Sequence, residues 1–133
     1  MEWRKDDYLI TDDNSKVQLD IVHRLLSATY WGDRRPREAV ERMIGGSICF
    51  SLYRGAMQIG FGRAVTDGAT FTWVADIVVE PDFRGFGLGQ WLMECLMPIE
   101  PLFRLNRIGC WPGLRAPMHN LRCLRSSVVC GRR

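Results

Sequence analysis

The sequence lacks the features that mark membrane and secreted proteins. No apolar run approaches the ~20 residues that cross a bilayer, and residues 1–7 have no apolar stretch of the kind found in a signal peptide. The five cysteines are an odd number and form no C-x-x-C pair, which fits a reducing compartment better than a disulfide framework. Cys110, His119, Cys123 and Cys130 match no zinc-ligand spacing. We therefore expect a cytoplasmic protein with free thiols, no metal and no membrane partner.

Negative charge is absent from the last third of the chain. Residues 101–133 contain seven arginines and no Asp, Glu or Lys, so residues 1–100 hold the remaining 11 basic side chains against all 15 acidic ones. A basic block is typical of a solvated arm or of a segment attracted to polyanions, including nucleic acid and nucleotide phosphates. This block lacks interleaved aromatics and a helix-turn-helix pattern, so we do not expect a nucleic-acid partner.

The length and composition fit one compact domain. A chain of 133 residues buries roughly two-thirds of the surface that it exposes when unfolded. A content of 47% hydrophobic and 25% charged residues is typical of a globular protein rather than a disordered one. Within this domain we distinguish a core, residues 1–100, from an atypical segment rich in Arg and Cys, residues 101–133.

Two helices are predicted in the first third of the chain. Apolar residues recur at helical spacing over residues 17–26, and residues 12–15 offer capping side chains, so the first helix should end near Tyr30. A second helix should begin at Pro36, whose fixed φ suits a first helical position, and end at Gly45–Gly46. The residues of this helix that should face inward are Val40, Met43 and Ile44.

Three strands joined by short turns should follow the helices. The side chains alternate with a period of two over residues 47–53, which predicts a strand with one buried face. Further strands are expected over residues 57–65 and 69–79, and the short turns make the three strands an antiparallel meander. An apolar helix is expected over residues 88–97, and residues 107–111 predict a last strand.

A glycine-rich loop links the third strand to the apolar helix. It has glycines at 85, 87 and 89 and follows Arg84, which can add a charge-assisted donor. The first N–H groups of a helix have no partner within the helix, so this order of strand, loop and helix forms an anion site suited to phosphate. The alternative is a helix N-terminus that merely tolerates glycine, and the isolated motif does not decide between the two.

Two other phosphate-binding folds are excluded by spacing. The loop has no Lys-Ser or Lys-Thr after its last glycine, which a P-loop requires. It also differs from the G-x-G-x-x-G of a dinucleotide fold. The parallel strands of that fold need crossover helices, whereas the strands expected here are joined by short turns.

The segment around the loop resembles the GNAT family of N-acetyltransferases. In this family a strand and a turn lead to R/Q-x-x-G-x-G/A at the start of a helix, and Arg84, Gly87 and Gly89 match that pattern. The order of elements upstream is also similar, with two helices and then a meander that ends in residues 75–79. The resemblance covers roughly residues 1–97 and rests on motif and element order together.

The resemblance implies a fold, a co-substrate and a reaction. The fold class would be α/β (α+β), a GNAT-like mixed, mostly antiparallel sheet flanked by helices. The reaction would transfer an acetyl group from acetyl-CoA to a primary amine of a small molecule or peptide, by direct attack in a ternary complex. The pantetheine arm would lie along the backbone of Ile77 and Val79, and the pyrophosphate in the loop. The implied binding residues are Ile77, Val78, Val79, Arg84, Gly85, Phe86, Gly87, Leu88 and Gly89.

Asp76 is the candidate catalytic base. It lies in mid-strand among apolar residues, and because desolvation penalises the charged form, partial burial would make it a better proton acceptor. By alternation, Val74, Asp76 and Val78 should share one face of the strand. The alternative is a carboxylate at a strand bulge or hydrogen-bonded to the neighbouring strand. Glu80 is a second candidate, although we expect it in the turn.

The C-terminal segment departs from the GNAT pattern. Family members continue with a helix whose tyrosine protonates the leaving thiolate, whereas here Arg122 lies near that position and no tyrosine follows Tyr53. A frameshifted or replaced end and ordinary divergence both explain this. Incomplete C-terminal strands would expose a sheet edge, which favours a homodimer or another partner. The alternative function is therefore a catalytically impaired acyl-CoA-binding or partner-dependent module.

Three residues of the first helix and its end are weaker candidates. His23 is more often a partly exposed helix residue than a catalyst, and we keep it as a remote candidate for the acceptor site. In the family the acceptor cleft often opens after the first helix, where Tyr30 and Trp31 lie. Two aromatic residues at a helix end are more commonly part of the core, and we expect that arrangement here.

Overall fold

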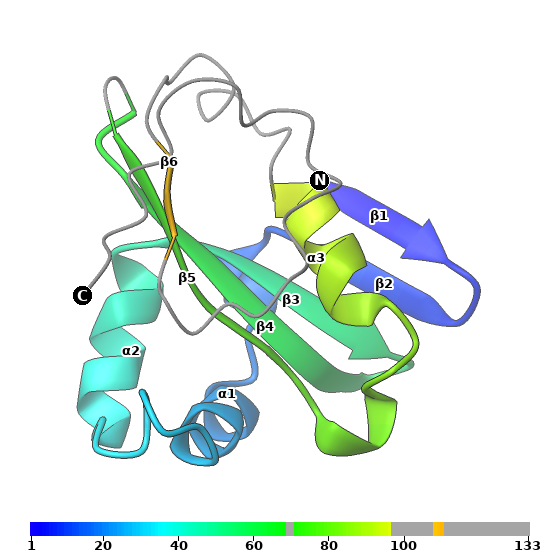
Figure 1. The fold of residues 1–133 in the computed structure, drawn as a ribbon, viewed down its shortest axis with the longest axis horizontal. Coiled ribbons are helices and arrows are strands. Elements are labelled where there is room, and N and C mark those ends of the chain that lie inside the picture. Colours follow the sequence, from blue (N-terminus) through cyan, green and yellow to red (C-terminus); the bar gives the residue numbers. More distant parts are fainter. Residues whose placement is uncertain (69–70, 97–107, 111–133) are drawn as a thin grey trace.

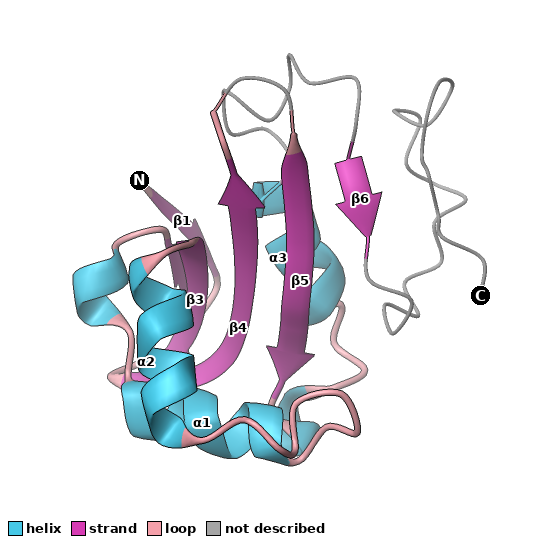
Figure 2. Cartoon of the chain, turned by 90° about the vertical axis from the view of Figure 1, so that its left-hand side faces the viewer, coloured by secondary structure: helices cyan, strands magenta, loops and turns pink. Residues whose placement is uncertain are grey.

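The fold is a six-stranded sheet with helices on both faces (Figures 1 and 2). In this computed structural model the described residues are 1–68, 71–96 and the backbone of 108–110. Five strands pair antiparallel in chain order, and the sixth pairs parallel to the fifth. The expected mixed, mostly antiparallel sheet is therefore confirmed. The strands are β1 (Glu2–Lys5), β2 (Tyr8–Thr11), β3 (Ile48–Arg54), β4 (Met57–Thr66), β5 (Thr72–Val79) and β6 (Ile108–Cys110).

Three α-helices flank the sheet. Helices α1 (Leu19–Ser27) and α2 (Arg37–Gly45) cover one face, and α3 (Leu88–Leu96) covers the other (Figure 2). The second helix begins at Arg37, one residue after the predicted start, with Pro36 at its N-cap rather than at its first helical position and with Val40 fully buried. Among the helices that the structure describes, none has the length and apolar character needed to cross a membrane.

The first helix starts later than the periodicity predicts. A short 3-10 turn, η1 (Asn14–Lys16), comes first, and Asp13 Oδ1 accepts a hydrogen bond from the Ser15 N–H at 2.9 Å. Helix α1 begins only after Gln18, whose backbone is extended because its N–H donates to Gln58 Oε1 on β4 at 2.8 Å. The capping group expected among residues 12–15 therefore caps the 3-10 turn rather than the α-helix.

The sequence analysis did not predict the hairpin formed by β1 and β2. Its turn places Asp6 at a φ of 52°. Its apolar side chains contact the α3 side of the sheet, where Ile10 is fully buried and the Trp3 ring lies 5.8 Å from that of Phe50. Charged residues occupy most of the other positions of this edge hairpin. These charged residues hide the alternation of apolar and polar side chains, so the sequence pattern does not predict the hairpin.

Both faces of the sheet are buried. Phe50 and Leu52 of β3 pack toward α3, whereas Cys49 packs toward α1 and α2, so the prediction of one buried face for this strand is wrong. The reason is that helices cover the sheet on both sides. The α3 side contains Ile10, Phe50, Leu52, Ile59, Ala64, Val74, Val79, Leu88, Leu92, Met93, Cys95 and Leu96. The opposite side contains Val22, Leu25, Leu26, Val40, Cys49, Phe61 and Val78.

A bulge interrupts the pairing of β4 with β5. Phe61 pairs with Val78 and Arg63 with Ala75, so Gly62 alone lies opposite Asp76 and Ile77. Such an extra residue changes the phase of the strand. Val74 consequently packs on the α3 side and Val78 on the other side, and the predicted shared face of Val74, Asp76 and Val78 is wrong.

Candidate functional site

The edge of β5 that faces away from β4 is only partly paired. Strand β6 pairs with Thr72–Val74, which confirms the strand expected near residues 107–111. From Ala75 to Val79, no strand of the described parts of the chain pairs with this edge. The edge is therefore open along the half of β5 that leads to the glycine loop.

The backbone groups of Ile77 and Val79 point to this open edge. The Glu80 N–H donates to Ile59 O at 2.7 Å, and Val78 O lies beside Gly60, so residues 78 and 80 face β4. Because the peptide groups of successive strand residues face opposite edges, those of Ile77 and Val79 face away from β4. An extended amide-containing ligand could pair with them in the way a strand does.

The glycine loop adopts a backbone that favours glycine. It follows a short 3-10 turn, η2 (Pro81–Phe83), and Gly85 and Gly87 have φ values of 88° and 75°. No heavy atom lies within 4 Å of a Cβ added at either position. The glycines are therefore required by the backbone conformation and not by close packing.

The loop presents a row of N–H groups that have no partner among the described residues. The first helical hydrogen bond runs from the Trp91 N–H to Gly87 O at 3.0 Å. No residue that the structure describes accepts a hydrogen bond from the N–H groups of Gly85 through Gln90. Phe86 in this loop is 69% exposed. Free N–H groups at the start of a helix bind anions, which supports the predicted phosphate site over a helix start that merely tolerates glycine.

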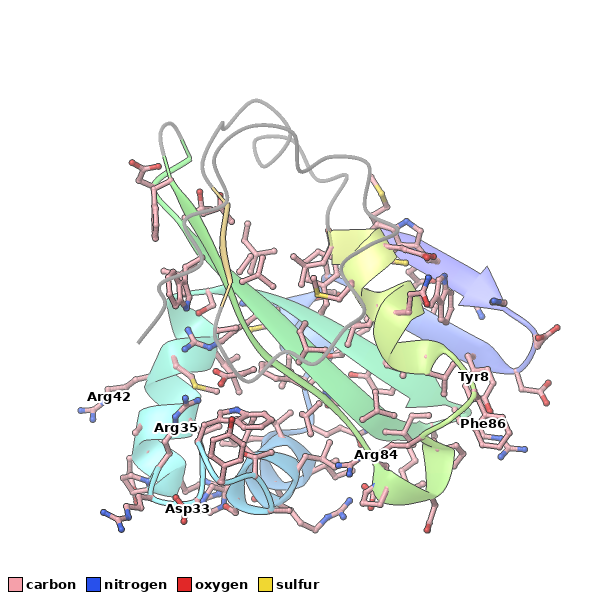
Figure 3. All side chains as sticks on the ribbon, viewed as in Figure 1. Tyr8, Asp33, Arg35, Arg42, Arg84 and Phe86 are labelled. Atoms are coloured by element: carbon pink, nitrogen blue, oxygen red, sulfur yellow. The ribbon has the colours of Figure 1, made fainter. Side chains whose placement is uncertain are left out.

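Arg84 connects the loop to the open strand edge. Its Nε donates to Val79 O at 2.9 Å, so this nitrogen is not available to a phosphate. The side chain accordingly lies between the edge of β5 and the start of α3 (Figure 3). The expected charge-assisted donor to an anion can only come from the two terminal nitrogens of the guanidinium group.

Asp76 is buried and paired with two arginines. Its Oδ2 accepts hydrogen bonds from Arg63 Nε at 2.5 Å and from Arg35 Nη1 at 2.8 Å, and its side chain is 1% exposed. Arg63 lies on the neighbouring strand, so the arrangement is the bulge carboxylate that the sequence analysis named as the alternative to a base. The backbone of Asp76 has a φ of 57°, which is uncommon for a residue other than glycine. Strained residues of this kind concentrate at functional sites, and the role of Asp76 as a base stays a prediction.

Glu80 is held in an ion pair at the end of β5. Arg24 Nη1 and Nη2 donate to its Oε1 and Oε2 at 2.9 and 2.8 Å, a two-pronged contact between α1 and the strand end. The hydrogen bonds from Arg24 lower the pKa of Glu80. The residue lies between β5 and η2, as expected, and it connects the strand to α1.

The two described thiols are unsuited to nucleophilic chemistry. Burial raises the pKa of Cys49 to about 12 and that of Cys95 to about 11, so neither is a thiolate near neutral pH. Both are free cysteines. Within the described residues no three His, Cys, Asp or Glu side chains are grouped to hold a metal ion.

The residues near the end of α1 differ from the sequence expectation. Tyr30 is 77% exposed, so the prediction that it belongs to the core is wrong, and Trp31 is only half-buried. Its indole Nε1 is nevertheless a buried atom with no hydrogen-bond partner among the described residues. His23 Nε2 lies 3.2 Å from Arg35 O, a contact that ties α1 to the start of α2. The tail residues 111–133, and the missing tyrosine with them, lie outside the described residues.

Sequence reasoning missed Arg35 and Arg63. A buried Asp in a strand requires a basic partner, so the position of Asp76 was itself a signal. Arg63 lies 13 residues away and Arg35 lies 41 residues away along the chain. Tertiary packing determines which basic residues of the chain pair with Asp76, and the local sequence pattern carries no information about that packing.

Comparison with known proteins identifies the family. The acetyltransferase (GNAT) domain family matches residues 45–120, more than half of the chain. A Gibberella zeae protein assigned as an acetyltransferase is 29% identical over 136 residues, which cover 87% of this chain and 72% of that protein. A Gracilaria tenuistipitata protein named an uncharacterized N-acetyltransferase is 36% identical over 85 residues, which cover 60% of this chain and 46% of the other.

The fold agrees with the same assignment. A crystal structure of a Xanthomonas campestris protein assigned to the GNAT family superposes with a TM-score of 0.76 at 32% identity, covering 86% of this chain and 79% of that one. A Deinococcus radiodurans protein assigned as an acetyltransferase shares the fold over the whole chain and 94% of its own, with a TM-score of 0.66 at 20% identity. The motif at the start of α3, the open edge of β5 and these matches agree, and the chain belongs to the GNAT family of acetyltransferases.

Proposed function

We propose that this acetyltransferase moves the acetyl group of acetyl-CoA to a primary amine of a small molecule or peptide, which attacks directly in a ternary complex. One observation carries the proposal. The open edge of β5, where no described strand pairs with Ile77 and Val79, leads directly into the N–H groups from Gly85 to Gln90, which have no partner among the described residues. An amide-bearing arm that ends in a pyrophosphate needs this order of partners.

The residues present fit acetyl-CoA. Amide groups of the pantetheine arm would pair with the Ile77 carbonyl and the Val79 N–H, because Val79 O already accepts from Arg84 Nε. The pyrophosphate would accept hydrogen bonds from the loop over residues 84–89, where the helix start adds a favourable dipole. A GNAT acetyltransferase from Elizabethkingia anophelis, of the same fold at 16% identity and a TM-score of 0.54, has acetyl-CoA bound. At that identity the likeness concerns the fold, so the support lies in the donors of this chain.

The chemistry requires a proton acceptor and a donor to the carbonyl oxygen. Acetyl-CoA supplies an acetyl group activated as a thioester. The amine must lose one proton when the C–N bond forms, and the C–S bond breaks to release CoA as a thiolate, which takes up one proton, so that none is gained or lost overall. Asp76 Oδ2 is occupied by two arginines, whereas Oδ1 accepts from no residue that the structure describes. We propose that Oδ1 takes the proton, directly or through water. The N–H of Ile77 is suited to stabilise the developing oxyanion.

Titration and turnover test the proposal together. The purified chain should bind acetyl-CoA in calorimetry and release CoA thiol with members of a panel of amines. Asp76→Asn should lower turnover by about 10²–10⁴-fold while acetyl-CoA affinity is retained, because a general base acts only in the chemical step. The matched control is Asp33→Asn, which removes an exposed carboxylate from the loop after α1 (Figure 3).

The outcomes separate the alternatives. Binding without thiol release above background hydrolysis would indicate the acyl-CoA-binding module instead, and a folded chain that does not bind would refute the site. If Asp76→Asn keeps its turnover across the pH range, Asp76 is not the base. A change in KM alone would mean that Asp76 acts by positioning Arg35 and Arg63.

A further inference from the structure

The charges at the bulge of β5 do not balance. Asp76 is the one carboxylate that contacts Arg35 and Arg63 within the described residues, so two guanidinium groups share a single negative charge. The side chains of Arg35 and Arg63 are 29% and 16% exposed. Partly buried charges are normally paired, because removing an unpaired ion from water is unfavourable. Among the described residues, the cluster therefore carries one positive charge that no carboxylate compensates.

Several donors of this cluster are unused. Arg63 Nε donates to Asp76, and its Nη1 donates to Ser47 Oγ at 3.1 Å. Arg35 Nη1 donates to Asp76 and also lies 3.6 Å from Met43 Sδ. In the described parts of the chain, no acceptor contacts Arg63 Nη2 or the Nε and Nη2 atoms of Arg35. Guanidinium groups with free N–H donors are the preferred partners of carboxylates.

The chain has few acidic side chains left to fill this position. Outside the described residues the sequence contains a single acidic side chain, Glu100, and residues 101–133 contain none. In the loop between α1 and α2, Trp31 adds a buried indole N–H without a partner among the described residues. These observations favour an external anion over an internal one.

The cluster lies next to the proposed reaction centre. Asp76 immediately precedes Ile77, whose backbone faces the open edge, and successive Cα atoms are about 3.8 Å apart. The proposed pyrophosphate loop follows the C-terminal end of β5, so the acyl end of the arm would extend back along the edge toward Asp76. Arg35 Nη1 lies 2.8 Å from Asp76 Oδ2, so an acceptor amine that reaches this end would lie near the guanidinium group of Arg35.

We infer that the acceptor is an amino carboxylate, a small molecule with both an amine and a carboxylate, whose carboxylate binds Arg35 and Arg63. The inference rests on the proposed function and adds the chemical class of the acceptor. Arg35 supplies the more exposed donors, and Asp76 holds both guanidinium groups in place by its contacts with Nη1 and Nε. The amine of the same molecule then points to the edge at Ile77.

Matched acceptor pairs test the inference. Amino acids and their carboxamides, which differ only in the carboxylate, are compared by kcat/KM for CoA thiol release. The acids should be preferred, and Arg35→Gln should lower kcat/KM for the acids by about tenfold to a hundredfold, the range expected for a lost charge-assisted hydrogen bond. The amides should change by less than about twofold, because they make no ionic contact with Arg35.

Two controls separate charge from folding. Arg42→Gln removes an equal charge from α2, where Arg42 is exposed and points away from the sheet (Figure 3), and it should leave both kcat/KM values unchanged. If Arg35→Gln does not fold, the wild-type chain is tested by competition. Propionate should then inhibit acetyl transfer to an amide acceptor, and propionamide should not.

The results distinguish this inference from the proposed function. Equal kcat/KM for acids and amides, or equal inhibition by propionate and propionamide, overturns the carboxylate site while acetyl transfer stands. A preference for acids that survives in Arg35→Gln also overturns it. Thiol release with other amines of the panel but with no member of the pairs overturns the carboxylate site alone, and a chain that binds acetyl-CoA but releases no thiol with any amine overturns both.

Discussion

Gly62 lies opposite the bulge of β5, and its replacement by alanine tests how the bulge is packed. A Cβ at this position would lie 2.5 Å from Ile77 Cδ1 and 3.5 and 3.6 Å from Leu92 Cδ2 and Leu96 Cδ1. The first distance is shorter than carbon atoms approach in proteins, so Ile77 must move. Leu92 and Leu96 are fully buried and leave little space on the α3 side. The clashing atom is the end of a partly exposed side chain, so the cost should lie near the lower end of the about 1–3 kcal/mol typical of overpacking, and urea denaturation of Gly62→Ala should show that loss in the free energy of unfolding.

A double-mutant cycle identifies the clashing group. Ile77→Val removes the Cδ1 methyl and alone should destabilise the chain by about 0.5–1.5 kcal/mol. In that background Gly62→Ala should be neutral or stabilising, because alanine restricts the unfolded chain more than glycine does. The coupling between the two sites should therefore reach about 1 kcal/mol or more. Gly45→Ala, where no atom lies within 4 Å of the new Cβ, is the control. Additive effects at 62 and 77 would refute the packing described for the bulge.

Two further predictions concern the ends of β5 and α3. Gly87→Ala should weaken acetyl-CoA binding modestly, because alanine at this positive φ costs about 1–2 kcal/mol. Gly87→Glu should abolish the binding, because it adds negative charge at the proposed phosphate site. Calorimetry that shows unchanged affinity for Gly87→Glu would remove the loop from the site. The pKa of Glu80 is lowered from 4.5 by Arg24, so its ion pair stabilises the fold above that value and the contribution disappears as the pH falls through the folded-state pKa. Because Arg24 is more than half exposed, Glu80→Gln should cost less than about 1 kcal/mol at pH 7. Urea denaturation at pH 7 and pH 3 should show this cost at the higher pH only, and an equal cost at both would contradict the assignment.

The parts of the fold that could be predicted are those set by local pattern. The meander of β3, β4 and β5 and the start of α2 just after Pro36 follow from side-chain period and from turn and cap residues. The glycine loop could be placed because positive φ at Gly85 and Gly87 restricts the residue type. The β1–β2 hairpin could not, because it is stabilised by pairing with β3 and by packing of Ile10.

The candidate site was only partly accessible from sequence. Its glycine loop and strand edge are local features, so Arg84 to Gly89 and Ile77 to Val79 could be named in advance as candidates. The partners of Asp76 could not, because Arg35 and Arg63 are brought to it by the packing of α2 and the pairing of β4. The side-chain alternation predicted along β5 was wrong for the same reason, because the bulge forms opposite Gly62, which lies in another strand, β4.

The bulge links the charge cluster to the strand edge. Counted from Val74 by strict alternation, Asp76 would point to the apolar side beneath α3, where a lone carboxylate would be unpaired at a cost of several kcal/mol. The extra residue turns it to the other side, where Arg35 and Arg63 bind it. The positive φ of Asp76 costs on the order of 1–3 kcal/mol, which is less than the several kcal/mol that a buried, unpaired carboxylate would cost. The same shift places the Val79 side chain on the α3 side of the sheet, and the backbone groups of Ile77 and Val79 face the open edge. A single bulge therefore positions both the carboxylate and the proposed cofactor contacts.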